Sequence, residues 1–325
     1  MRAAKAKSRR RWLIRAAGSV AMLALLAWLL PVHTVMAGFS RVPPALFGGV
    51  LLAFLFGHVA AAAKWWALLG RALPFGAALR AHFAGLASNL MLPGVAGGDA
   101  VRAAIAQASL HDGGQVVAGA LADRLVDMLA LACLVAIGAF MLAGGGSGAL
   151  AVQVLVVFAA ALVGTIYIAP RLLPALWGRL ALPGREAAAR LAGALRAIGR
   201  NPLVLAGTLA LSVAIQGLFV LLAMQLARAV GLDLPPGAWF FAWPLAKILA
   251  VLPISLGGLG LREASLAALL APFGADAAQV VTAGLTWQAV LWLTGGLGAL
   301  VLTFTGVGWR PQAGAAGMPG RGHRR

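Results

Sequence analysis

The stretch LMLPGVAGGDAVRAA, Leu90–Ala104, holds one proline, three glycines, an aspartate and an arginine. The chain around it is strongly apolar, because 62 % of its 325 residues are hydrophobic and only 10 % are charged. Soluble domains have roughly 45–50 % apolar and about 25 % charged residues. The chain is therefore predicted to bury its surface in lipid, and this stretch to interrupt the backbone within the membrane.

A second stretch, VLPISLGGLGLREAS (Val251–Ser265), repeats the pattern of the first without a gap. The shared pattern is L-P-x3-G-G-x3-R, and its two copies are Leu92-Pro93-Gly97-Gly98-Arg102 and Leu252-Pro253-Gly257-Gly258-Arg262. Because proline and glycine interrupt helices, the segments 75–108 and 238–272 are predicted to break near their middle.

Apolar runs of at least about 18 residues indicate membrane-spanning helices. Six runs qualify: 13–30, 45–69, 115–142, 149–169, 203–227 and 278–305. We expect an all-α polytopic membrane protein with these six full spans and two re-entrant helical hairpins at 75–108 and 238–272. Three spans separate the hairpins, so they are predicted to enter from opposite faces as an inverted-topology repeat.

Basic residues orient the spans. Seventeen lysines and arginines lie at the amino terminus (residues 2–15), in the 170–202 linker and in the tail, whereas the four loops on the other side hold only Arg41 and Arg228. The seventeen are Arg2, Lys5, Lys7, Arg9, Arg10, Arg11, Arg15, Arg171, Arg179, Arg185, Arg190, Arg196, Arg200, Arg310, Arg321, Arg324 and Arg325. By the positive-inside rule both termini and the linker are predicted to be cytoplasmic, in an inner-membrane protein. This placement also accounts for the net charge of +18, so nucleic-acid binding is not expected.

The domain organisation follows from these runs. A basic cytoplasmic arm (1–12) precedes a single transmembrane domain (13–305), and a disordered basic tail (306–325) follows it. The repeat halves are 13–169 and 203–305, joined by the linker 170–202, in which Arg185 to Arg200 is predicted to form an amphipathic surface helix. The first run could instead be a cleaved signal peptide with its site near Ala37; we favour a retained anchor, and cleavage would leave the other orientations unchanged.

The glycine pairs and the arginines that follow them are predicted to bind an anion. Non-helical backbone at membrane depth occurs where it is buried in protein or lines a wet cavity. Backbone N–H groups at a glycine pair and the start of a helix favour negative charge, and a guanidinium fits phosphate with two hydrogen bonds. The predicted substrate-binding residues are Gly97, Gly98, Arg102, Lys247, Gly257, Gly258 and Arg262.

Charged residues inside apolar spans raise the free energy of insertion into the membrane, so they are interpreted as functional by default. The predicted intramembrane charge network consists of Asp99, Asp123, Arg124, Asp127 and Glu263. We expect Arg102 to meet the face that carries Asp123 and Asp127, and Arg124 to pair with Asp127. Asp99 is interpreted as a helix cap, and Lys64 is expected to extend toward the membrane surface. The alternative is that these charges only hold helices together.

No catalytic residue, metal or cofactor is predicted. The five histidines, His33, His58, His82, His111 and His323, have no ligand spacing, and Cys133 is the single cysteine. No phosphate-binding P-loop is present, so the sequence indicates no nucleotide-driven step.

The motifs resemble those of the lysylphosphatidylglycerol synthase transmembrane family, also called flippase-like domain proteins. The matching stretches are SNLMLPGVAGGDAVRA (Ser88–Ala103), DRLVDMLAL (Asp123–Leu131) and LPISLGGLGLREAS (Leu252–Ser265). The middle motif usually begins with Glu-Arg in that family, so Asp123 is a conservative departure. The resemblance covers about 13–305 and implies two re-entrant segments and movement of a lipid head group between leaflets. No soluble aminoacyl-transferase domain follows the membrane region here, so aminoacylation is not expected.

The function that these features favour is translocation of an anionic lipid or lipid-linked head group. Two alternatives remain: an integral membrane transferase that acts on a lipid, or a non-catalytic membrane partner of an envelope biosynthesis enzyme. The expected partners are membrane lipids with an anionic head group, and a homo-oligomer is compatible with the sequence.

Overall fold

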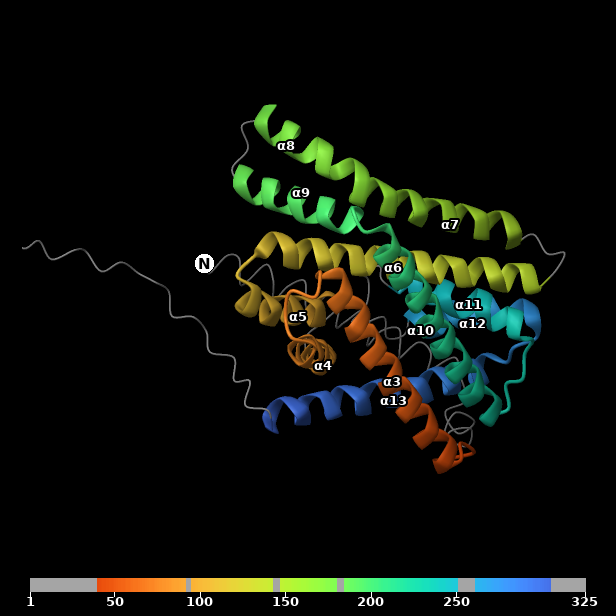
Figure 1. Cartoon of the computed structure of the whole chain (residues 1–325). Coiled ribbons are helices and arrows are strands. Elements are labelled where there is room, and N and C mark those ends of the chain that lie inside the picture. The colour runs from red at the N-terminus through yellow and green to blue at the C-terminus, as the bar shows by residue number, and fades with distance from the viewer. Residues whose placement is uncertain (1–39, 92–94, 143–146, 180–183, 251–260, 305–325) are drawn as a thin grey trace, which may run out of the picture.

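The computed structural model describes residues 40–91, 95–142, 147–179, 184–250 and 261–304, and over these residues it is all-helical (Figure 1). Five of its helices are long and apolar enough to cross a membrane: Pro44–Leu68, Gly113–Met141, Val152–Trp177, Pro202–Ala229 and Ala277–Leu300. They correspond to five of the six predicted spans, and the sixth, 13–30, lies outside the described residues. The chain is a multi-pass membrane protein.

Three spans are single uninterrupted helices, α3 (Pro44–Leu68), α6 (Gly113–Met141) and α10 (Pro202–Ala229), and a fourth lies within α13 (Ala277–Phe304). At about 1.5 Å per residue, a helix of this length exceeds the roughly 30 Å hydrocarbon core of a bilayer. Proline at the first position of α3 and α10 suits a helix start, because the first N–H groups have no partner within the helix.

The predicted end of the fourth span, at residue 169, is wrong. The helix continues from α7 (Ser147–Val163) through a π-helical turn, Gly164–Ile168, into α8 (Ala169–Arg179). A proline at position 170 removes a backbone donor, and a π turn is a common way for a helix to continue past such an irregularity. Arg171, expected in a linker, therefore lies within the helix. Only 6 % of the apolar window of this span is buried in the protein, as expected for a helix that faces lipid.

The amphipathic helix predicted in the linker is present as α9 (Arg185–Gly199). Its buried side chains, Ala188, Ala192 and Leu195, lie on one face, and α9 packs against α6 and α8. Its arginines Arg185, Arg190, Arg196 and Arg200 are exposed. This division between a buried apolar face and an exposed basic face is the pattern that the sequence indicated.

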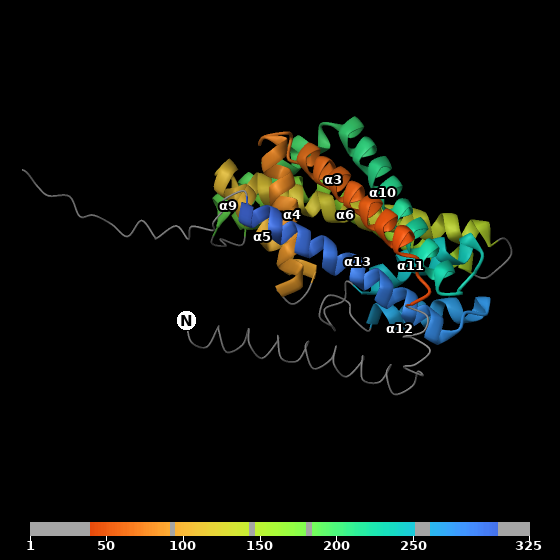
Figure 2. The same cartoon turned by 90° about the horizontal axis from the view of Figure 1, so that it is seen from below.

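Two pairs of shorter helices occupy the segments predicted to break. Helix α4 (Phe75–Met91) packs against α5 (Val95–Leu110), and α11 (Pro236–Leu249) packs against α12 (Leu261–Leu270). Figures 1 and 2 show the first pair near α9 at one end of the bundle, and the second pair at the other end. Helix α13 packs along α4, and α11 packs along α6, so each pair is joined to a span of the bundle.

The first glycine pair does not lie in the break itself. Helix α5 begins at Val95, so Gly97 and Gly98 belong to its first turn, while residues 92–94 and the second pair, Gly257 and Gly258, lie outside the described residues. Gly98 instead allows close packing, because a Cβ there would collide with the carbonyl oxygen of Gly85 on α4 and with the side chain of Asn89. The glycines therefore bring α4 and α5 into backbone contact.

Because α4 and α5 touch at these glycines, we predict that alanine destabilises the protein at Gly85 but not at a glycine with open space around it. In Gly85→Ala the new Cβ would lie 2.7 Å from the carbonyl oxygen of Gly98, so we expect the free energy of unfolding to fall by about 1–3 kcal/mol. Gly207→Ala, on α10, is the matched control, because a Cβ there meets nothing within 4 Å. Thermal unfolding of the purified proteins in one detergent measures both, and equal midpoints would contradict the packing role.

Candidate functional site

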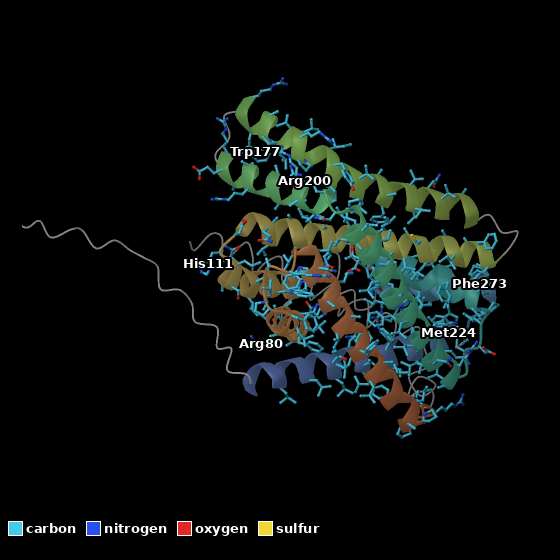
Figure 3. The ribbon with its side chains drawn as sticks, in the orientation of Figure 1. Arg80, His111, Trp177, Arg200, Met224 and Phe273 are labelled. Atoms are coloured by element: carbon cyan, nitrogen blue, oxygen red, sulfur yellow. The ribbon has the colours of Figure 1, made fainter. Side chains whose placement is uncertain are left out.

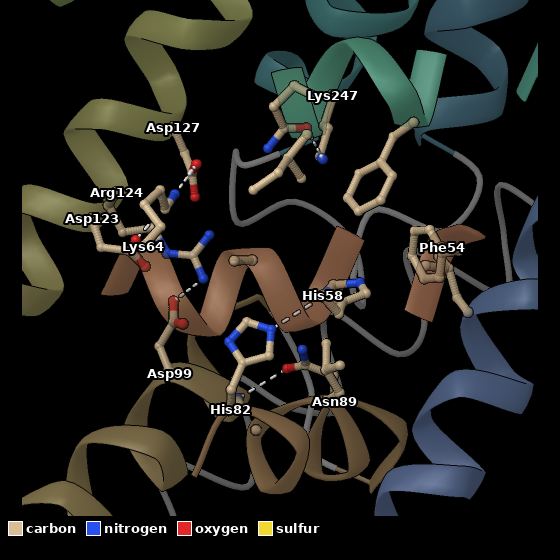
Figure 4. A pocket seen from close by; sticks show the side chains of 18 of the residues that line it. Phe54, His58, Lys64, His82, Asn89, Asp99, Asp123, Arg124, Asp127 and Lys247 are labelled. Atoms are coloured by element: carbon tan, nitrogen blue, oxygen red, sulfur yellow. Dashed lines mark hydrogen bonds and ion pairs between the residues drawn. The ribbon is translucent and has the colours of Figure 1, made fainter. Parts of the chain in front are cut away.

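A cavity of about 310 Å³ lies where α3, α4, α5, α6, α10, α11, α12 and α13 meet (Figure 4). One part of its wall is charged and comes from α3, α5 and α6. The other part is largely aromatic and comes from α3, α10, α11 and α13, through Phe54, Phe219, Trp243 and Trp287. Both arginines that follow the glycine pairs, Arg102 and Arg262, line this cavity.

Lys64 lies at the centre of the charged wall. Its ammonium is 3.1 Å from a carboxylate oxygen of Asp123 and also pairs with Asp127, which accepts a further hydrogen bond from Ser212 on α10. The expectation that Lys64 extends to the membrane surface is wrong, because the residue is only 2 % exposed. Helix α3 is apolar all round, so the face of α3 that meets α6 was not evident from its sequence.

Arg102 meets the acidic face of α6, as predicted. Its guanidinium donates to Asp123 at 2.8 Å, lies 3.4 Å from Asp99, and stacks over the ring of Trp65 with 4.5 Å to the ring centroid. Arg102 and Asp123 are both buried. Asp123 thus pairs with two cations, Lys64 and Arg102, from two different helices.

Asp99 does not act as the predicted helix cap. Helix α5 begins four residues earlier, and the Asp99 carboxylate lies between two guanidinium groups, those of Arg102 and Arg124. Arg124 therefore pairs with Asp99, and the predicted pair with Asp127 is replaced by the pair between Asp127 and Lys64. On this wall three cations face three carboxylates.

The part of the cavity wall formed by α11 and α12 carries more cations than carboxylates among the described residues. The ammonium of Lys247 on α11 donates to Gln216 Oε1 at 2.7 Å and lies 5.6 Å from the ring centroid of Phe219. Among the residues that the structure describes, no carboxylate lies within ion-pair distance of Lys247. Arg262 on α12 donates through Nε to Glu263 at 3.0 Å, and Glu263 is almost fully buried behind it.

Of the predicted site residues, Gly257 and Gly258 lie outside the described residues, and the others divide into two groups. Arg102, Arg262, Lys247, Gly98, Asp99, Asp123, Arg124 and Asp127 line the cavity. Glu263 is buried beside Arg262, and neither Glu263 nor Gly97 lines the cavity. The backbone N–H of Gly98, expected to point at a ligand, donates to Asn89 Oδ1 at 2.9 Å, so in this structure that donor is already used.

Several residues of the site were missed. Besides Lys64 these are the polar groups Ser212 and Gln216 of α10, Asn89, and the histidines His58 and His82. Ser212 and Gln216 are four residues apart within an apolar span, and two polar residues at that spacing share one face of a helix. That signal was present in the sequence and would have directed α10 toward the site.

The family model described as the lysylphosphatidylglycerol synthase TM region matches residues 12–298. A comparison with curated proteins found no match.

Proposed function

The chain belongs to the family of the lysylphosphatidylglycerol synthase TM region, and from this premise we propose that it translocates an anionic lipid or lipid-linked head group across the inner membrane. The head group would enter the cavity, while the acyl or prenyl chains stay in the lipid.

The observation that carries this proposal is Lys247, which bonds to a neutral amide and has no carboxylate within ion-pair distance among the described residues. Over the described residues the cavity is lined by five cations, Lys64, Arg102, Arg124, Lys247 and Arg262, and by three carboxylates, Asp99, Asp123 and Asp127. A charged side chain at membrane depth costs at least about 2.5–3.5 kcal/mol on insertion scales unless it has a partner. A phosphate beside Lys247, within reach of Arg262, would provide that partner.

The aromatic wall suits the remainder of such a ligand. Phe54, Phe219 and Trp287 pack on one another with ring centroids 4.6–6.2 Å apart, and Trp243 joins them through Trp287. Apolar walls with a few converging polar groups are typical of small-molecule sites, and they strengthen the attraction between charges by excluding water.

We also infer that the two helix pairs are re-entrant hairpins related by an inverted repeat. The pairs lie at opposite ends of the bundle (Figures 1 and 2), and three spans, α6, α7–α8 and α10, separate them along the chain. Each pair contributes an arginine of the repeated motif to one cavity. A site between repeats lets either face open in turn, which is how many secondary transporters work.

We predict that α9 and both termini lie on the cytoplasmic side of the membrane. Figure 3 shows His111 and Trp177 toward the end of the bundle that holds α9, and Phe273 toward the other end. In a Cys133→Ala background, a cysteine at position 189 should react with a membrane-impermeant maleimide only from the inside, and one at position 276 only from the outside. Labelling of both from one side would contradict this orientation.

Replacing Asp99 by asparagine is expected to tighten head-group binding about tenfold. The Asp99 carboxylate holds Arg102 and Arg124, and its removal frees both guanidinium groups for phosphate, with a hydrogen bond to a charged group contributing about 1.5–3 kcal/mol. Titration of purified protein with short-chain phosphatidic acid or phosphatidylglycerol measures the dissociation constant. Asp233→Asn, at an exposed ion pair with Arg228, is the control. Weaker binding by Asp99→Asn would show that Asp99 serves only to position the arginines.

Translocation by the reconstituted protein tests the function. Proteoliposomes receive head-proximal fluorescent phosphatidic acid, phosphatidylglycerol, polyprenyl phosphate or phosphatidylcholine, and the fraction protected from a membrane-impermeant quencher is followed with time. We expect accelerated movement of at least one anionic lipid over protein-free vesicles, and a smaller effect on phosphatidylcholine. Equal rates with and without protein for all the anionic lipids would refute the proposal.

A further inference from the structure

Two histidines join α3 to α4 inside the cavity and have no part in the ion pairs described above. His58 Nδ1 lies 3.1 Å from His82 Nε2, and both side chains line the cavity (Figure 4). His82 is 8 % exposed, and its other ring nitrogen, Nδ1, is buried without a hydrogen-bond partner among the described residues. His58 packs between the rings of Phe54 and Phe219, with centroids 4.5 and 5.4 Å away.

The geometry of the pair allows it to carry one additional proton. A hydrogen bond between two imidazoles needs one N–H donor and one nitrogen lone pair, so at least one ring is neutral when the bond is formed. The second nitrogen of each ring can then hold or release a proton without breaking this bond. Imidazole titrates near neutral pH in water, but burial favours its neutral form, so a buried pair takes up a proton only when negative charge is added beside it.

The charges around the pair make its protonation depend on the ligand. The charged groups that act most directly on it are Lys64 on α3, Arg102 on α5, Asp123 and Asp127 on α6, and Lys247 on α11. Asp99 on α5, Arg124 on α6 and Arg262 on α12 also line the cavity. The faces that α10 and α13 turn toward the cavity contribute Phe219, Gln216, Trp287 and Leu291, which do not titrate. An anionic head group that enters beside Lys247 adds negative charge to this field, and a charge separated from the imidazoles by a few ångströms of low-dielectric wall interacts with them strongly.

We propose that the His58–His82 pair takes up one proton when an anionic head group binds in the cavity and releases it when the head group leaves, so that lipid movement is coupled to a proton. This inference rests on the proposed function and names its energy source. By linkage, head-group affinity rises as the pH falls, by up to about tenfold per pH unit in the range where the pair titrates. A pH gradient across the membrane then gives the lipid movement a direction.

Proton uptake on binding tests the coupling. Purified protein in weakly buffered detergent solution is mixed with short-chain phosphatidic acid, phosphatidylglycerol or polyprenyl phosphate, and an indicator dye reports the protons taken up. Because phosphomonoesters bind protons themselves, the quantity compared is the difference between the wild type and the His58→Gln and His82→Gln variants at equal occupancy. Glutamine keeps a donor and an acceptor but does not titrate. His111→Gln, at an exposed turn outside the cavity, is the control.

We expect the wild type and His111→Gln to take up about one proton more per bound head group than either cavity variant. The affinity of both cavity variants should also lose most of its dependence on pH, while they still bind the lipid at neutral pH. Equal proton uptake by all four proteins would overturn the coupling and leave translocation intact. Loss of binding at every pH, together with a lower melting temperature in both cavity variants, would overturn it in favour of a structural role. Absence of binding of all three lipids by the wild type would overturn the proposed function itself, and the coupling with it.

Discussion

Replacing Asp123 by asparagine is expected to lower the free energy of unfolding by about 3–5 kcal/mol, the usual cost of removing one partner from a buried ion pair. Asp123 is 3 % exposed and faces two cations, Lys64 at 3.1 Å and Arg102 at 2.8 Å. The asparagine amide can accept hydrogen bonds from them but cannot compensate their charge. Each cation keeps one further carboxylate, Asp127 for Lys64 and Asp99 for Arg102, so the loss should be partial and the protein should still be isolable.

The measurement is the thermal unfolding midpoint and the yield of folded protein in one detergent. Asp233→Asn is the matched control, because its pair with Arg228 is exposed and such pairs contribute about 0–1 kcal/mol. If Asp123→Asn and Asp233→Asn lowered the midpoint equally, the buried charges would not hold α3, α5 and α6 together.

Replacing Lys247 by methionine is expected to reduce transport without reducing stability. Methionine keeps the length of the side chain but removes the charge, so translocation of the anionic lipid should fall by about ten- to a hundredfold, the equivalent of about 1.5–3 kcal/mol for a hydrogen bond to a charged group. The melting temperature should rise or stay unchanged, because Lys247 is bonded to a neutral amide, that of Gln216, and no described carboxylate loses its partner.

The control for Lys247 is Arg228→Met, which removes one positive charge at an exposed position outside the cavity. Lys247→Arg retains the charge and should preserve much of the transport. Full transport by Lys247→Met at unchanged protein density would show that this cation does not meet the substrate, and unfolding of Lys247→Met would show that its role is structural.

The spans were predictable because the thickness of the bilayer sets a minimum length for an apolar helix. The contact between Arg102 and Asp123 was predictable for a related reason, since a charge at that depth needs a partner and few are available. The end of the fourth span was not predictable, because the π turn before position 170 lets the helix continue where a proline and an arginine indicated its end.

The rest of the site depends on how helices are rotated about their axes. Helix α3 is apolar on all sides, so the position of Lys64 along it did not reveal that the side chain faces Asp123 and Asp127. The pair between Asp99 and Arg124 depends on where α5 begins, and a repeat that contains both Pro93 and two glycines allows several starting points. Gly98 was interpreted as a ligand donor, but it packs against Gly85 because a hairpin of two helices needs close contact.

Photo-crosslinking of a head-group analogue tests the central claim most directly. A phosphatidic acid analogue with a small diazirine beside the phosphate is incorporated with the protein into nanodiscs and irradiated, and the modified peptides are identified by mass spectrometry. The account predicts labelling of the cavity wall, on α10 near Gln216 and on α11 near Lys247, with labelling reduced by an excess of unlabelled phosphatidic acid and in Lys247→Met. Labelling confined to the lipid-facing surface of α7–α8 and to the arginines of α9, unchanged in Lys247→Met, would contradict it.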